Sequence, residues 1–421
     1  MAHRILPLLI ISALLLLIDW YIFKALKTLN KKPSHSNSTL AICWWGYSFI
    51  LLAGIYSSIY FNLFLTLRAV ILVAFVLTFV SKVCYLPFLF IDDIRRLAVK
   101  LKLKRSKKPP SDKPVLPNPI PSEDKISRSE FIVKSGLVVA SIPFASLTWG
   151  IVSGAYDYQV VRKKLYLKNL PKAFDGIKMA QISDIHSGSF YNRKAVLGGV
   201  EMLLGEKPDF VFFTGDLVNN VASEMREYQD IFSKVKAPLG VYSSLGNHDY
   251  GEYKFGTWDN PEKFKNMEVL KKTHKNMGWD LLLNANRTLK VDNEEIAIIG
   301  VENWGAGARF PKKANLPLAM QGVEDAPVKL LLSHDPTHWR AQVLNNTDID
   351  AMFSGHTHGM QFGVRIKELQ WSPVKYLYNE WAGLYQENGQ QLYVNVGYGF
   401  LGYPGRVGIL PEITIFELRR A

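Results

Sequence analysis

Three long apolar segments near the beginning of the chain constrain its fold more than any other feature. Residues 5–23 contain one charged side chain, Asp19, residues 39–61 contain none, and residues 63–91 contain only Arg68 and Lys82. A helix needs about 20 apolar residues to cross the hydrocarbon core of a bilayer, and each segment is long enough. Because three such segments follow one another, a cleaved signal peptide does not explain them. We therefore expect residues 1–92 to form three transmembrane helices.

The charges between these segments predict how the chain is oriented in a membrane. The connection after the first segment is rich in lysine, and a second basic run follows the third segment, made of Arg95, Arg96, Lys100, Lys102, Lys104, Arg105, Lys107 and Lys108. Basic loops favour the cytoplasmic side of a membrane. We therefore expect residues 93–134, which include the proline-rich stretch 109–121, to form a cytoplasmic linker.

A fourth stretch, residues 135–154, is uncharged but milder, with serine, glycine and Pro143 within it. We expect it to be a fourth span, which would place residues 155–421 outside the cytoplasmic membrane of a multi-pass protein. If this stretch does not cross, the same charges leave residues 155–421 in the cytoplasm.

Composition narrows the classes of function. Nearly all of the formal net charge of +13 falls on the first 134 residues, beside the apolar segments, and the remainder is close to neutral. A nucleic-acid-binding protein would concentrate that charge around its binding site, so we expect no nucleic-acid partner. The two cysteines, Cys43 and Cys84, both lie in apolar segments, which excludes a disulfide framework and a cysteine-based metal site.

Beyond about residue 156, short apolar runs alternate with polar clusters. Five runs, at 177–183, 210–214, 241–245, 328–333 and 351–354, each lead into Asp, Asn or His, either directly or after one glycine. Such runs are typical of buried strands, and the amphipathic stretch 194–204 between the first two predicts a strand–helix–strand unit. Ligand sites in such sheets lie beyond the carboxyl ends of the strands. The sequence therefore predicts that all five polar clusters meet at one site.

The residue types in these clusters are typical of divalent-metal ligands. Five of the nine histidines fall there, together with Asp184, Asp216 and Asn247; these histidines are His186, His248, His334, His356 and His358. Carboxylate and imidazole ligands suit Zn, Mn or Fe. Two catalytic ions lie ~3.5–4 Å apart, so one side chain should bridge them. Gly215 and Gly246 allow the tight turns that would present Asp216 and Asn247.

These motifs resemble the calcineurin-like metallophosphoesterase superfamily, most closely its bacterial membrane-associated phosphodiesterase branch. The pattern comprises D-x-H at 184–186, G-D-x-x-x-N at 215–219, G-N-H-D at 246–249, His334 and G-H-x-H at 355–358. The resemblance implies an α/β sandwich of two mixed β-sheets flanked by helices. It also implies one metal on Asp184, His186, Asp216 and His358, and another on Asp216, Asn247, His334 and His356.

The resemblance implies a membrane-anchored hydrolase in which a metal-bridging hydroxide attacks a phosphodiester or pyrophosphate, with lipid-linked phosphates among the candidate substrates. His248 would contact the phosphoryl group or protonate the leaving oxygen. Asn219 and Asp249 would brace neighbouring loops, and a chemical role for these two residues stays equally open. The aromatic segment 371–385 fits an interfacial surface and ordinary packing equally well.

Two alternatives stay open, namely a phosphomonoesterase or protein phosphatase, and a membrane sensor or transporter whose outer domain only regulates. Against the latter, Arg68 and Lys82 have no obvious acidic partner in the sequence.

Overall fold

A computed structural model of the chain describes residues 2–29, 35–61, 65–105, 127–307, 310–366 and 369–421. Within these limits the chain divides into two compact units, Met1–Thr148 and Trp149–Ala421, which we describe separately. The proline-rich stretch 109–121 lies outside the described residues.

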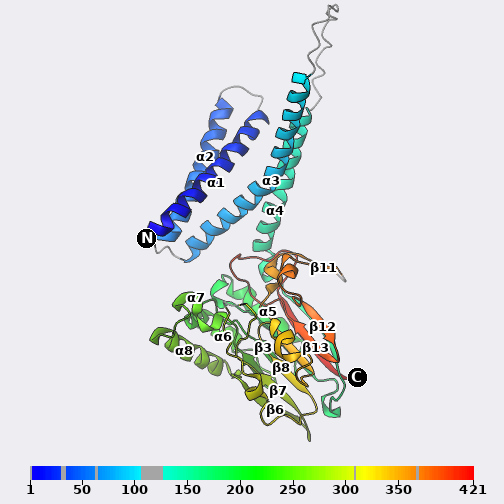
Figure 1. The fold of residues 1–421 in the computed structure, drawn as a ribbon. Helices are drawn as coiled ribbons and strands as arrows, with labels where there is room; N and C mark the ends of the chain where they lie inside the picture. The colour runs from blue at the N-terminus through cyan, green and yellow to red at the C-terminus, as the bar shows by residue number, and fades with distance from the viewer. Residues whose placement is uncertain (1, 30–34, 62–64, 106–126, 308–309, 367–368) are drawn as a thin grey trace, which may run out of the picture. The chain divides into compact units, whose positions relative to one another are not determined.

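The first unit is formed by long apolar helices (Figure 1). They are α1 (Ala2–Leu29), α2 (His35–Tyr60), α3 (Leu65–Arg105) and α4 (Arg128–Val152), whose last turn belongs to the second unit. All four are long and apolar enough to cross a membrane. Many of their apolar side chains are exposed, among them Ile42 and Ile50 at 73% each, as expected of surfaces that face lipid. The third helix continues through the basic residues up to Arg105 and does not end at residue 92.

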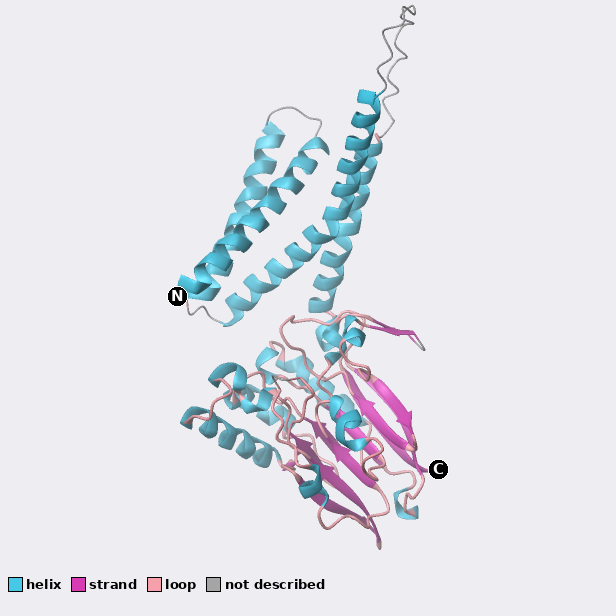
Figure 2. Cartoon of the chain, in the orientation of Figure 1, coloured by secondary structure: helices cyan, strands magenta, loops and turns pink. Residues whose placement is uncertain are grey.

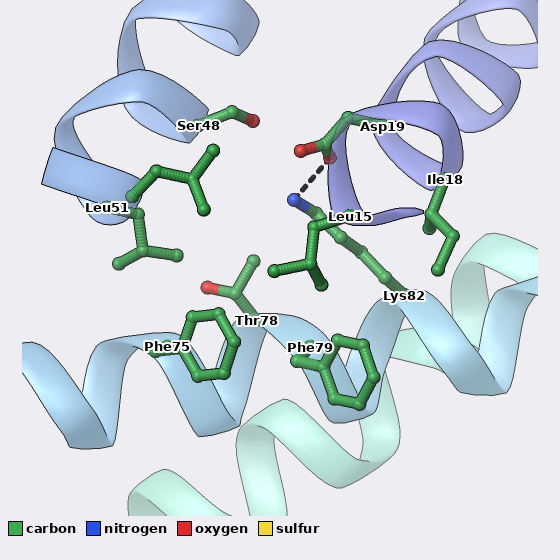
Figure 3. A pocket seen from close by; sticks show the side chains of 10 residues that line it. Leu15, Ile18, Asp19, Ser48, Leu51, Phe75, Thr78, Phe79 and Lys82 are labelled. Atoms are coloured by element: carbon green, nitrogen blue, oxygen red, sulfur yellow. Dashed lines mark ion pairs between the residues drawn. The ribbon is translucent and has the colours of Figure 1, made fainter. Parts of the chain in front are cut away.

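One expectation about the spans is wrong. Lys82 does have an acidic partner, because its ammonium group forms an ion pair with Asp19 of α1 (Figure 3). The two residues are 63 positions apart in the sequence, so their pairing depends on how α1 packs against α3, which the sequence does not display. Lys82 also lies 5.2 Å from the ring centroid of Trp44 on α2. An apolar environment strengthens such polar contacts between helices, and these join three helices of the unit.

The second unit is a sandwich of two six-stranded mixed sheets, as the resemblance implied (Figure 2). The first sheet has the order β1-β14-β2-β3-β4-β5, and the second has the order β12-β13-β9-β8-β7-β6. In the first sheet the strands are β1 (Gln159–Leu167), β14 (Glu412–Arg420), β2 (Lys178–Ile182), β3 (Phe210–Thr214), β4 (Val241–Ser244) and β5 (Asp280–Leu281). In the second they are β12 (Gly383–Glu387), β13 (Gln390–Val394), β9 (Ala351–Ser354), β8 (Lys329–Leu332), β7 (Glu294–Gly300) and β6 (Ala285–Val291).

The five apolar runs of the sequence form β2, β3, β4, β8 and β9, and the pairs β2–β3, β3–β4 and β8–β9 are parallel. Their side chains are buried because each sheet packs on both faces. Between the sheets, the rings of Phe212 and Phe353 lie with their centroids 5.3 Å apart. These contacts hold the carboxyl ends of both sets of strands at one end of the sandwich.

Helices and short turns cover the outer faces. The helices are α5 (Arg193–Gly205), α6 (Gln229–Phe232), α7 (Glu252–Phe255), α8 (Pro261–Met277) and α9 (Leu316–Met320). The short 3-10 elements are η1 (Gly154–Tyr156), η2 (Lys172–Phe174), η3 (Ser187–Ser189), η4 (Ala222–Glu227), η5 (His248–Tyr250), η7 (His358–Gln361) and η8 (Pro373–Tyr376), and η6 (Trp339–Val343) is a π-helix. The expected helix at 194–204 is α5, which begins after Asn192, whose side chain accepts a hydrogen bond from the Ala195 amide. A separate hairpin pairs β10 (Val364–Ile366) with β11 (Leu369–Trp371).

Candidate metal centre

The polar clusters after five strands meet at one place, as the strand pattern predicted. Asp184 and His186 follow β2, Asp216 follows β3, Asn247 and His248 follow β4, His334 follows β8, and His356 and His358 follow β9. Six of these side chains fall into two groups whose potential ligand atoms lie within 4.8 Å of one another. One group is Asp184, His186 and His358, and the other is Asp216, His334 and His356.

The backbone is strained where it presents these residues. Asp184, His186, Asp216, His356 and His358 all have positive φ angles, between 49° and 73°. Non-glycine residues adopt such angles rarely, at a cost of about 1–3 kcal/mol each, and they concentrate at functional sites. The preceding glycines fit this geometry, because a Cβ at Gly246 would lie 2.2 Å from Asp216 Oδ1 and Gly215 has a φ of 96°. The turns expected at both glycines are therefore present. Gly215 is needed there for its positive φ angle, and Gly246 is needed because a side chain would collide with Asp216.

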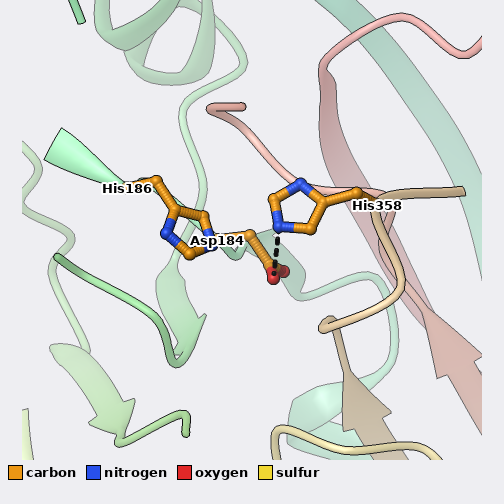
Figure 4. A group of neighbouring side chains, drawn as sticks. All are labelled: Asp184, His186 and His358. Atoms are coloured by element: carbon orange, nitrogen blue, oxygen red, sulfur yellow. Dashed lines mark ion pairs between the residues drawn. The ribbon is translucent and has the colours of Figure 1, made fainter. Parts of the chain in front are cut away.

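In the first group the side chains point toward a common centre (Figure 4). The Nε2 atom of His358 lies 3.2 Å from Asp184 Oδ1. The Nε2 atom of His186 lies 3.5 Å from Asp216 Oδ2. This group therefore extends to a carboxylate of the second group.

The second group shares the same carboxylate oxygen. His334 Nε2 lies 3.1 Å from Asp216 Oδ2, and His356 Nδ1 lies 3.3 Å from His334 Nε2. One oxygen of Asp216 thus lies close to a histidine nitrogen of each group. This is the position that a bridging ligand between two ions requires.

Several buried polar atoms at the centre have no hydrogen-bond partner within the described part of the chain. They are His186 Nε2, Asn247 Oδ1 and His358 Nε2, whose 3.2 Å approach to Asp184 Oδ1 lacks the angles of a hydrogen bond. Buried polar atoms are normally hydrogen-bonded, so three exceptions at one place need an explanation. All three are atoms of metal-ligand types, and two divalent cations would satisfy them. The donor set therefore fits a pair of metal ions.

Hydrogen bonds on the outer side of the histidine rings orient them toward this centre. His334 Nδ1 lies 2.7 Å from the Thr214 carbonyl, and His186 Nδ1 lies 3.0 Å from Asn219 Oδ1. These bonds place the ring proton on Nδ1 and leave Nε2 available as a ligand atom. His356 has the opposite arrangement, because its Nε2 lies 2.8 Å from the Tyr378 hydroxyl and its Nδ1 faces His334.

Burial and neighbouring charges shift the pKa values of these groups in opposite directions. Burial acts to raise the pKa of Asp216, but His334 and His248 hold it well below its usual value. Burial acts to lower the pKa of His334, but Asp216 raises it to about 10. Burial lowers the pKa of His186 to about 3. Burial also lowers the pKa of His358 well below its usual value, and His186 and Arg406 lower it further. Burial lowers the pKa of His356 as well. His186, His356 and His358, three of the four candidate histidine ligands, are thus kept in the neutral form that binds metal.

His248 lies at the edge of the centre and belongs to neither ligand group. Its Nδ1 is 2.7 Å from the Asn219 carbonyl, and its ring stacks on Tyr253 with centroids 4.5 Å apart. Its amide donates a 2.8 Å hydrogen bond to Asp216 Oδ1. These contacts hold the ring beside the centre through its Nδ1 atom and its face, and neither of them uses Nε2.

Asn219 and Asp249 brace the loops, in line with the role expected for them. The buried carboxylate of Asp249 accepts hydrogen bonds of 2.9 Å from the amides of Asp216, Leu217 and Gly246. It thereby joins the loop after β3 to the loop after β4. Tyr378 is a site residue that sequence reasoning missed, because it belongs to no metal-ligand motif and only the fold brings it to His356.

Comparisons with known proteins identify the family to which this sequence is similar. Residues 177–360 match the family model described as "Calcineurin-like phosphoesterase", and residues 3–155 match "Probable Calcineurin-like phosphoesterase, transmembrane domain". A transmembrane protein with a metallophosphoesterase domain from Danio rerio is 28% identical over 65% of this chain, and the match spans 60% of that protein. A metallophosphoesterase of Bacillus subtilis is 29% identical over 70% of this chain and 98% of its own length. The phosphodiesterase YaeI of Escherichia coli is 24% identical over 62% of this chain and 88% of its own length.

Proposed function

We infer that this chain, which belongs to the membrane-associated calcineurin-like metallophosphoesterases, hydrolyses phosphoester bonds with two divalent metal ions. The observation that carries this inference is the single carboxylate oxygen of Asp216 between two groups of potential ligands, with buried histidine and asparagine atoms unsatisfied around it. A structural cluster of buried histidines would be expected to satisfy these atoms internally.

Seven side chains would hold the two ions. Asp184, His186, Asp216 and His358 would bind one ion, and Asp216, Asn247, His334 and His356 would bind the other. When bound, two such cations supply an activated water and offset negative charge on the phosphoryl oxygens. The carboxylate and imidazole set suits Mn, Zn or Fe.

The chain's own residues then have separate tasks. The Asn219 carbonyl fixes the Nδ1–H of His248, so that a second proton on the ring is carried on Nε2, where it can be donated to the leaving oxygen. Asn219 also orients His186 through its side chain, which couples the candidate acid to a candidate ligand. Asp249 keeps the two loops at a fixed separation and does not itself face the reacting group.

We propose a phosphodiester or pyrophosphate as the substrate, with lipid-linked phosphates as the leading class. The phosphodiesterase named among the similar proteins supports the diester, at low identity. Four candidate spans support a substrate in or near the membrane. We also propose that the catalytic unit lies on the outer side of the cytoplasmic membrane, because the basic loops favour the inside.

Two assays on the purified full chain test this proposal. A bis-aryl phosphodiester should be hydrolysed in a metal-dependent way, and faster than the matched aryl phosphomonoester. A preference for the monoester would favour the phosphomonoesterase alternative. If a metal-loaded chain hydrolysed neither compound nor any pyrophosphate, the regulatory alternative would replace an enzymatic role.

A further inference from the structure

The β10–β11 hairpin has an apolar face that is exposed. Val364 pairs with Trp371 and Ile366 pairs with Leu369 across the two strands. Directly paired residues in an antiparallel ladder point to the same side, so these four side chains form one face. Ile366 is 64% exposed and Leu369 is 63% exposed. Figure 2 shows the hairpin projecting from the body of the second unit.

The opposite face of the hairpin is polar and is fixed to the protein. Arg365 lies on that face, paired with Gln370, and forms an ion pair with Glu412, whose side chain is only 1% exposed. Glu412 also accepts hydrogen bonds from the Tyr393 and Thr414 hydroxyls, of 2.7 Å each. The hairpin is therefore amphipathic, but its polar face contacts the protein and its apolar face is exposed, which is the opposite of the arrangement usual at a surface that faces water. Its charged face is held inward, which obliges its apolar face to point outward.

Two more exposed apolar side chains follow the hairpin, one at the end of η8 and one directly after it. Tyr376 is 73% exposed and Leu377 is 69% exposed, and both follow the hairpin closely in the sequence. We call Val364, Ile366, Leu369, Trp371, Tyr376 and Leu377 the apolar rim. Concentrated exposed apolar side chains of this kind mark a surface that contacts another apolar phase or partner.

The rim is connected to the end of the last apolar helix through residues of the same unit. The Arg406 amide donates a 3.1 Å hydrogen bond to the Gly150 carbonyl in the last turn of α4. The next residue, Val407, accepts a 2.9 Å hydrogen bond from the amide of Gly363, which immediately precedes β10. Trp149 and Val152 in that last turn are themselves 69% and 75% exposed. The hairpin therefore begins next to the point where an apolar helix of spanning length ends.

We propose that the apolar rim inserts into the lipid bilayer, so that the catalytic unit contacts the membrane surface directly and not only through its helices. The bilayer is the occupant because α4, which is long and apolar enough to span it, is hydrogen-bonded in its last turn to Arg406, and the next residue, Val407, is hydrogen-bonded to the residue that precedes β10. Aromatic and aliphatic side chains at such a boundary bury themselves at the level of the headgroups and acyl chains.

Insertion would also place the metal centre near lipid headgroups. His358 lies six residues before Val364 of the rim, a separation of at most about 21 Å along the chain. Tyr378, which contacts His356, directly follows Leu377 of the rim. This placement favours substrates whose phosphoester is in a headgroup and whose tails remain in the bilayer, an inference that rests on the proposed function.

A fluorescence measurement on the full chain tests insertion without relying on activity. Cys43 and Cys84 are first replaced by alanine, and an environment-sensitive fluorophore is attached to Ile366→Cys in nanodiscs of phosphatidylcholine and phosphatidylglycerol. The matched control is Trp258→Cys, which replaces a side chain that is 84% exposed and outside the rim. We expect blue-shifted emission and quenching by acyl-chain-brominated lipids at residue 366, and neither effect at residue 258. Equal exposure to water at both positions would overturn the proposal, and so would a disulfide between two Ile366→Cys chains before the fluorophore is attached.

The consequence for substrates is tested separately. The double variant Ile366→Glu with Leu369→Glu should hydrolyse a vesicle-embedded phosphodiester several-fold more slowly than the wild type, with an unchanged rate on a soluble bis-aryl phosphodiester. Gln370→Glu, on the opposite face, is the control and should leave both rates unchanged. An unchanged vesicle rate in the double variant would overturn the substrate consequence. If the wild type hydrolysed neither compound, the proposed function would fail while the fluorescence result still decided insertion.

Discussion

Asp216 is the residue on which the account of the metal centre depends most. Its Oδ2 atom lies 3.5 Å from His186 Nε2 and 3.1 Å from His334 Nε2, and its Oδ1 atom accepts the His248 amide. The Asp249 carboxylate in turn holds the Asp216 amide. The side chain is thus fixed between the two ligand groups before any ion binds.

Asp216→Ala should therefore remove both activity and the pair of ions. The variant lacks the carboxylate that would bind both cations, so less negative charge offsets the repulsion between two cations that lie close together. Elemental analysis of the purified variant should find fewer than two tightly held ions, and diester hydrolysis should fall to background. Two retained ions with near-normal turnover would show that another residue bridges them.

His248→Ala should separate rate from metal content. Because His248 lies outside both ligand groups, the variant should keep its metal stoichiometry while the rate falls by ~10²–10⁴ for loss of a general acid. The loss should be smaller for a substrate with a better leaving group, which needs less protonation. Loss of an ion in this variant would instead make His248 a ligand.

His274 provides a pH-dependent stability term away from the centre. Burial lowers its pKa to about 3 from an ordinary value of 6.5. Between these two values the unfolded chain binds a proton at His274 that the folded chain does not bind. The contribution of His274 to the free energy of unfolding is therefore complete above about pH 6.5. It declines by about 1.4 kcal/mol per pH unit as the pH falls toward 3.

His274→Phe should weaken this acid sensitivity. The Ser243 hydroxyl, which lies 3.0 Å from His274 Nδ1, also donates to the Asp280 carbonyl and so keeps one partner. Thermal unfolding of the full chain in detergent, followed between pH 7 and pH 4, should show a smaller loss of melting temperature for the variant. Equal losses for both proteins would mean that His274 is not titrated on unfolding.

At the scale of elements, the sequence predicted the strands and the side chains that gather at their ends, but not what orients these side chains. The runs at β2, β3, β4, β8 and β9 were recognisable because buried parallel strands need nearly continuous apolar side chains, and each ends in a ligand type. Tyr378 was not recognisable as a site residue, because its role depends on how η8 lies against the loop of His356. The same is true of Asp19 and Lys82, whose pairing is a product of helix packing.

Tyr378→Phe tests whether an element outside the motifs tunes the centre. Removing the hydroxyl that lies 2.8 Å from His356 Nε2 leaves the ring free to change tautomer and orientation. Loss of such an outer hydrogen bond costs about 10–100-fold in metal affinity or activity. We expect weaker binding of one ion only, with activity restored by excess Mn²⁺. Tyr376→Phe, two residues earlier and 73% exposed, is the control. Unchanged metal affinity in Tyr378→Phe would assign this hydroxyl a purely structural role.

At the scale of the whole molecule, the side of the membrane that the catalytic unit faces determines which substrates it meets. The spanning candidate Arg128–Tyr156 has a mean hydropathy of 1.6, between the 1.5 of the second candidate and the 2.1 of the third. Because it is the last candidate before the catalytic unit, whether it crosses, together with the basic residues that precede it, decides the side that this unit faces.

A reporter fusion after Val160 tests this orientation. An enzyme that is active only outside the cytoplasm should be active when joined there, and a cytoplasmic reporter at the same position should be silent. A fusion after Arg105, at the end of α3, is the matched control and should give the opposite result. The reverse pattern at Val160 would place the catalytic unit inside and direct the search for substrates to the cytoplasm.

The central claim is that two ions and one bridging carboxylate make this chain a phosphoester hydrolase. The most direct test is to titrate the metal-free full chain with Mn²⁺ while following hydrolysis of a bis-aryl phosphodiester and the number of ions bound. The account predicts that the rate reaches its plateau at two ions per chain and that Asp216→Ala shows no plateau. A plateau at one ion, or full activity in the presence of a strong chelator, would contradict it.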